Sequence, residues 1–135
     1  MRGAKLLLLS LVTIAASCAT PQASGDAAPP SFVGTWHQFD ADCPGAEPVR
    51  ELILQANGHF SVTWTPFETY QDYWGSWRYD ANTHVLTLTV DNGNNIPADL
   101  VLSGAVSVDA QHLNLGAISL GSPREGVRCT VPFHR

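Results

Sequence analysis

The sequence predicts an all-β domain, a small eight-stranded up-and-down antiparallel β-barrel, on three observations. Short apolar segments recur about every 8 to 12 residues, and turns rich in Gly, Asn, Asp and Pro separate them. Apolar and polar residues alternate within most segments, which is the period of a strand with one buried face. No stretch shows sustained helical periodicity. Closure into a barrel would remove the exposed edges of the sheet.

Eight or nine strands are expected between residues 33 and 133. The first two are expected at residues 33–39 and 49–56, and Asn57-Gly58 is expected to form a type I′ turn, in which both central residues need a positive φ. A third strand follows until Pro66, which cannot donate to a ladder. The later strands are expected at residues 73–79, 83–91, 96–103, 106–108, 113–115 and 126–133.

Residues 57–80 contain three of the four tryptophans and all three tyrosines. We interpret this span as two antiparallel strands joined by an aromatic loop at residues 66–72. Because neighbouring strand residues point to opposite faces, Trp74 is expected on the polar face that Ser76 and Arg78 share. Phe67 and Tyr70 are expected at the mouth of the barrel, where ligands usually enter.

Residues 1–17 have the layout of a secretory signal peptide. Arg2 and Lys5 precede an uncharged run, and small residues lead directly into Cys18. This resembles the bacterial lipobox, in which that cysteine becomes the lipidated first residue of the mature chain. A secreted protein with a free Cys18 is the alternative. Since Ala19 and not Asp follows the cysteine, the resemblance implies an outer-membrane lipoprotein of the cell envelope that faces the periplasm.

Residues 18–31 read as the lipidated cysteine and a flexible tether, and residues 32–135 as the β-barrel domain. Without the signal peptide, five arginines and no lysine stand against twelve acidic residues, a formal charge of −7. Such a chain is not expected to bind nucleic acid or anionic headgroups through charge. Membrane attachment is therefore expected through the lipid anchor alone.

If Cys18 carries lipid, Cys43 and Cys129 remain as a pair in an oxidising compartment, and we expect them to form a disulfide. The two cysteines are 86 residues apart. In the chain-entropy model such a loop stabilises the fold by about 4 to 5 kcal/mol. A metal or catalytic thiol pair is the alternative, but no CxxC spacing supports it.

Gly34-x-Trp36 opens the first strand, a meander follows, and Arg128 or Arg135 lies near the last strand. Together these features resemble the lipocalin and wider calycin superfamily. The resemblance implies a barrel whose floor the tryptophan closes and across which the arginine stacks. Residues 66–75 also resemble segments of uncharacterised bacterial lipocalin-like lipoproteins. The domain is short and lacks the family's C-terminal helix, so a barrel filled by its own side chains is the open alternative.

No pattern typical of catalysis or of cofactor binding is found. The serines lack a GxSxG context, and phosphate-binding glycine patterns are absent, so we expect neither an enzyme nor a cofactor. The histidines show no HxH or HxxxH spacing, so no metal site is expected, although zinc sites do assemble from distant strands. The histidines are His37, His59, His84, His112 and His134.

Two functions from different classes follow. The first is a tethered lipocalin-like domain that binds a small apolar or amphipathic ligand. The residues expected to line or gate its site are Trp36, Trp64, Phe67, Tyr70, Trp74 and Trp77. The alternative is an envelope protein-interaction module, such as a lysozyme or protease inhibitor, that presents residues 67–74 and whose negative charge suits a basic target. Empty interior volume would distinguish the two.

Overall fold

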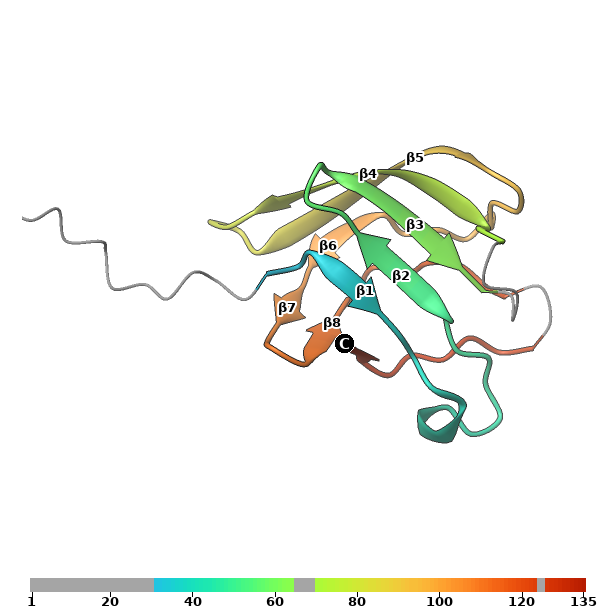
Figure 1. Cartoon of the computed structure of the whole chain (residues 1–135). Coiled ribbons are helices and arrows are strands. Elements are labelled where there is room, and N and C mark those ends of the chain that lie inside the picture. Colours follow the sequence, from blue (N-terminus) through green and yellow to red (C-terminus); the bar gives the residue numbers. More distant parts are fainter. Residues whose placement is uncertain (1–30, 65–69, 124–125) are drawn as a thin grey trace, which may run out of the picture.

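The computed structural model describes residues 31–64, 70–123 and 126–135 (Figure 1). The expected signal peptide, Cys18, nearly all of the tether and Phe67 lie outside these ranges. The described residues form nine short strands and one turn of 3₁₀-helix, η1 (Asp40–Asp42), without any α-helix, so the expected all-β class is confirmed. In this part of the chain, no helix has the length and apolar character needed to cross a membrane.

The larger sheet is a six-stranded antiparallel meander whose strands lie side by side in sequence order. It curls into a half-barrel, with the long β4–β5 hairpin along one side (Figure 1). Its strands are β1 (Gly34–Trp36), β2 (Glu51–Leu54), β3 (His59–Thr63), β4 (Tyr73–Asp80), β5 (Val85–Gly93) and β6 (Ser103–Ala105). The up-and-down order predicted for these strands is therefore confirmed.

A second sheet contains three short antiparallel strands. They are β7 (Ser107–Val108), β8 (His112–Asn114) and β9 (Phe133–His134). Val106 alone separates β6 from β7, and its N–H donates to the carbonyl of His84 at 2.9 Å. On the other side, His37 follows β1 and exchanges backbone hydrogen bonds of 2.7 and 2.8 Å with His134 of β9. The second sheet is thus joined to both edges of the larger sheet, next to β6 through Val106 and next to β1 through His37.

A single apolar core fills the inside of the curl, and the inward positions of β2, β3 and β5 supply much of it. Full burial of each large apolar side chain contributes about 1.5 to 3 kcal/mol. The buried members are Phe32, Trp36, Val49, Leu52, Leu54, Phe60, Val62, Trp64, Tyr73, Leu86, Leu88, Val106, Leu113, Leu115, Ile118, Leu120 and Phe133.

The turn between β2 and β3 differs from the expected type I′ turn. Gly58 has φ +85°, but Asn57 does not have a positive φ, since His84 is the one described non-glycine residue that does. The N–H of Gly58 donates to Gln55 O at 3.0 Å, so Ala56 and Asn57 are the central residues. Gly58 is then the left-handed residue of a three-residue hairpin loop with a bulge. The hairpin was predicted correctly and its turn type was wrong.

Two expected strands are mostly irregular, and each contains a proline that cannot donate to a ladder. Pro97 lies in the segment 96–103, where strand structure begins only at β6. Pro132 lies in the segment 126–133, which contributes only Phe133 to a strand. The shared apolar face expected there is also wrong at Val127, which is 67% exposed.

Candidate functional site

Trp64 lies between the core and a cavity at the end of β3. A cavity of about 90 Å³ opens beside it, and a larger surface hollow of about 620 Å³ also has Trp64 and Gln38 in its wall. Val49, Leu115, Ile118 and other apolar side chains form much of the cavity lining. The Trp64 side chain is buried, and its Nε1–H has no hydrogen-bond partner among the described residues. We call this space the Trp64 cavity.

Asp72 holds the backbone of Trp64 in place. Its Oδ2 accepts a hydrogen bond of 2.6 Å from the N–H of Trp64, and its own N–H donates to Val62 O at 2.9 Å. The carboxylate is fully buried, and Oδ1 has no partner in the part of the chain that the structure describes. Asp72 therefore fixes the point at which the chain leaves β3 and returns to β4.

Tyr73, next to Asp72, is a structural side chain. Its hydroxyl donates to the carbonyl of Leu120 at 2.8 Å, inside the core. Burial raises the pKa of Tyr73 far above its ordinary value, and the negative charges of Asp72 and Asp99 raise it further. The phenol thus remains protonated and continues to donate this hydrogen bond.

Trp36 lies away from the Trp64 cavity, beneath Arg135. It is fully buried, and its Nε1–H donates to Phe32 O at 2.9 Å. The Arg135 guanidinium lies 4.3 Å from the centre of the tryptophan ring and donates to Ser31 O at 2.6 Å. Of the two arginines considered for this contact, Arg135 makes it, whereas Arg128 donates to the hydroxyl of Ser119.

The other predicted aromatic residues do not gather around the Trp64 cavity. Trp74 is half-buried on the outer face of β4, as the alternation predicted, and lies opposite Ser61. Trp77 packs against the edge of the core, and its Nε1–H donates to Gln55 O at 2.9 Å. Tyr70 is half-buried and lies three residues before the start of β4. Trp64 is thus the one predicted ligand-binding residue, among those described, that lines the cavity.

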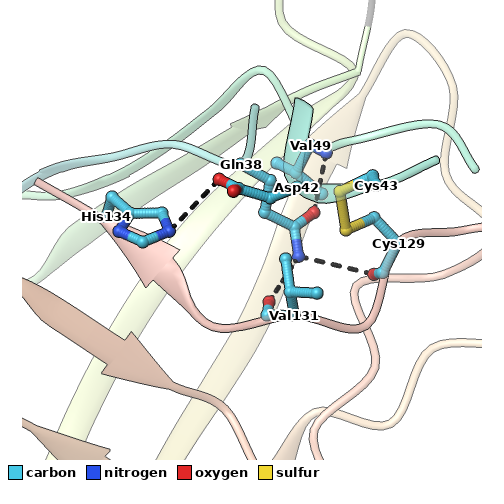
Figure 2. The surroundings of a disulfide bond; sticks show 7 residues. All are labelled: Gln38, Asp42, Cys43, Val49, Cys129, Val131 and His134. Carbon is cyan, nitrogen blue, oxygen red and sulfur yellow. Dashed lines mark hydrogen bonds and ion pairs between the residues drawn. A yellow bond between two sulfur atoms is a disulfide. The ribbon is translucent and has the colours of Figure 1, made fainter. Parts of the chain in front are cut away.

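The disulfide between Cys43 and Cys129 is present as expected, with its Cα atoms 5.5 Å apart (Figure 2). Buried Gln38 lies beside it. Gln38 Oε1 accepts from the N–H of Val49 at 2.9 Å, and Nε2 donates to the carbonyls of Val131 at 2.8 Å and Cys129 at 3.4 Å. This one side chain thus connects β1, the loop before β2 and the irregular segment before β9.

Sequence reasoning missed Gln38, although a signal was present. Gln38 lies two residues after Trp36, so strand alternation places it on the same inward face. A polar residue at an inward position needs hydrogen-bond partners. Its neighbours at residues 129–131 could be found only from the fold.

Three of the five histidines, whose sequence spacing predicted no metal site, lie in one row. His134 is directly opposite His37 on one side and His112 on the other. Asp42 Oδ2 is 3.4 Å from His134 Nε2, and Asp109 Oδ1 is 3.2 Å from His112 Nδ1. Within the described residues, no group of three or more His, Cys, Asp or Glu side chains is arranged to hold a metal ion as it stands.

Comparison with known proteins gives no match, whether with family models, with curated proteins or with solved structures. The fold and the site therefore define the class of protein. It is a small disulfide-linked all-β domain with a curled six-stranded sheet and a cavity at one end.

Proposed function

We propose that this chain is a lipid-anchored domain of the bacterial cell envelope that binds a small apolar or amphipathic ligand in the Trp64 cavity. The observation that carries the proposal is a cavity with apolar and polar walls beside the buried Trp64, whose N–H has no partner among the described residues. Ligand sites are typically apolar hollows with a few well-placed polar groups. A buried donor without a partner is costly, so a ligand that reaches this nitrogen and accepts its hydrogen bond would gain affinity.

The proposal includes a closed, lipocalin-like barrel of eight strands. The strands number eight if β6 and β7 are counted as one strand interrupted at Val106. The second half of that strand pairs with β8, and β8 pairs with β9. The hydrogen bonds between His134 of β9 and His37 after β1 would then close the ring of strands. The contact between Arg135 and Trp36 supports the resemblance to lipocalins, because it is the floor arrangement that the resemblance implies.

The size of the Trp64 cavity restricts the ligand. Sites for drug-sized ligands enclose about 300 to 1,000 Å³, whereas this cavity has about 90 Å³. It can take a short apolar group that ends in a hydrogen-bond acceptor. The adjoining hollow, which shares Gln38 and Trp64, can take the rest of an amphipathic molecule.

The position of the tether supports access to this site. Residue 31 lies beside Arg135, at the end of the domain where β1 begins. The start of β1 is paired with the end of β2, which is paired with the start of β3. Trp64 follows the last residue of β3 and so lies at the opposite end of the sheet. An anchor at Cys18 would therefore attach the domain at the end opposite the Trp64 cavity.

Native mass spectrometry of the chain purified from its host, combined with a Trp64→Phe variant, tests the proposal. We expect a copurifying small molecule that the variant retains about 3- to 10-fold less tightly, the effect of one lost neutral hydrogen bond. Trp74→Phe, on the outer face, is the matched control. A clean apo mass for all three proteins would refute ligand binding.

The filled core favours a second candidate, an envelope protein-interaction module such as a lysozyme or protease inhibitor. The formal charge of −7 expected for the mature chain would assist encounter with a basic enzyme. We expect inhibition at about micromolar concentration, weakened by salt because surface charges are screened. Absence of inhibition across a panel of lysozymes and envelope proteases would exclude this candidate.

The anchor has a test of its own. Cys18→Ser removes the thiol that lipid would modify, so the chain is expected to move from the membrane fraction to the soluble fraction. A variant that stays with the membranes would disprove the lipid anchor and leave the Trp64 cavity unaffected.

A further inference from the structure

The row of histidines contains one pair whose side chains approach closely. His37 and His134 exchange both of their backbone hydrogen bonds, so His134 and His112, on its other side, form the non-hydrogen-bonded type of pair. Side chains in such a pair lie closer together than in the hydrogen-bonded type. The rings of His112 and His134 are accordingly 5.0 Å apart between their centres.

A carboxylate lies next to this pair. Asp42, at the end of η1, points its Oδ2 at Nε2 of His134 from 3.4 Å (Figure 2). Asp42 directly precedes Cys43, so the disulfide to Cys129 restrains this part of the loop. Two imidazoles and one carboxylate from three separate segments of the chain are thus held within a small volume.

We propose that His112, His134 and Asp42 form a binding site for a divalent transition-metal ion of the zinc type. Zinc takes nitrogen and oxygen ligands tetrahedrally with bonds of about 2.0 to 2.2 Å. Neighbouring ligand atoms are then about 3.3 to 3.5 Å apart, and the centres of two bound imidazoles about 5 Å apart. The separations of 3.4 Å between Asp42 and His134 and of 5.0 Å between the rings match both values.

Asp109 prepares His112 for this role. Its carboxylate lies 3.2 and 3.3 Å from Nδ1 of His112, so this nitrogen carries the proton and Nε2 keeps its lone pair for a metal. Carboxylates commonly orient metal-bound histidines in this way.

The site closes through side-chain rotation. The side chains of His112, His134 and Asp42 are 51%, 34% and 43% exposed, so their rings and carboxylate have room to turn. Water supplies the fourth ligand, as in zinc sites with three protein ligands. His37 remains outside this set, because it forms the hydrogen-bonded type of pair with His134, in which the side chains lie further apart.

Calorimetric titration of the full chain with Zn²⁺ alone tests the site. At a pH of about 7.5 we expect saturable binding of one ion. His134→Ala and Asp42→Asn should each weaken binding by about tenfold or more, and Asp109→Asn by about tenfold. His59→Ala, at the start of β3, is the matched control and should bind as the parent does.

The ring resonances of the histidines give a second measurement. Zinc should shift the signals of His112 and His134 and leave those of His59 and His84 in place. His112→Ala serves as a further variant, because its exposed side chain can be removed without opening the core. Absence of saturable binding at about millimolar zinc, the parent's affinity in both His112→Ala and His134→Ala, or an equal loss in His59→Ala would each overturn the site.

Discussion

Replacing Gln38 by Leu tests how the irregular segment before β9 is held to the rest of the domain. The change keeps the side chain's approximate volume and removes its amide. Val49 loses an acceptor for its N–H at 2.9 Å, and Val131 loses a donor to its carbonyl at 2.8 Å. The longer contact of 3.4 Å to Cys129 O adds little.

The expected cost follows from the two groups left without partners. A buried backbone group without a hydrogen bond costs about 1 to 3 kcal/mol, and two such groups cost about 2 to 6 kcal/mol. The Val131 carbonyl is only part-buried, and leucine adds apolar surface to the core, so the lower half of this range applies. We expect the free energy of unfolding to fall by about 2 to 4 kcal/mol, a large share of the stability of a small domain.

Urea unfolding with the disulfide intact measures this difference. The midpoint should fall while the slope of the transition stays constant, because the same surface is exposed on unfolding. Gln111→Leu, at an exposed position in the turn before β8, is the matched control and should change stability by less than about 0.5 kcal/mol. If Gln38→Leu loses no more than this control, Gln38 does not hold the segment in place.

Three further predictions concern the disulfide, a close strand contact and the response to acid. Replacing both disulfide cysteines by serine should cost about 4 to 5 kcal/mol; an unchanged melting temperature would disprove the bond's contribution. Gly75→Ala should prevent folding, as seen by circular dichroism, because a Cβ there would lie 1.8 Å from Thr89 O; Gly104→Ala, with contacts of 3.4 Å or more, should fold normally. Hydrogen bonds from Ser122 lower the pKa of Asp99, so their stabilisation is present above the unfolded-state pKa of about 3.9 and is lost as the pH falls through the lower folded value. Ser122→Ala should therefore raise the pKa of Asp99, followed by NMR, toward its unfolded-state value. If the pKa of Asp99 does not change in this variant, the Ser122 hydroxyl is not what lowers it.

Sequence periodicity predicted the meander because apolar and polar residues alternate along most of its strands. In β4, Tyr73 faces the core and Trp74 faces outward, as the pattern required. The same pattern failed at residues 126–133, where Val127, Cys129, Val131 and Phe133 also alternate. Pro132 and the hydrogen bonds from Gln38 remove that segment from a ladder, and periodicity carries no information about either effect.

The site could be predicted only in part. The concentration of aromatic residues drew attention to Trp64, and this residue lines the cavity. Trp36, Trp74 and Trp77 lie elsewhere, because aromatic residues serve packing as readily as binding. The histidine row depends on cross-strand register between residues 97 positions apart (His37 and His134) and 22 positions apart (His112 and His134), and a single sequence does not specify such register.

The contact between Arg135 and Ser31 brings residues that are 104 positions apart to within hydrogen-bond distance. A short Gly/Ser linker could therefore join the two ends of the described domain, and new ends could be opened at the exposed turn Ala81–Asn82. Such a circular permutant keeps every strand neighbour and the disulfide, so it should retain the fold. It would also move the attachment point along the same end of the sheet, from the start of β1 to the β4–β5 turn, without changing a residue of the Trp64 cavity.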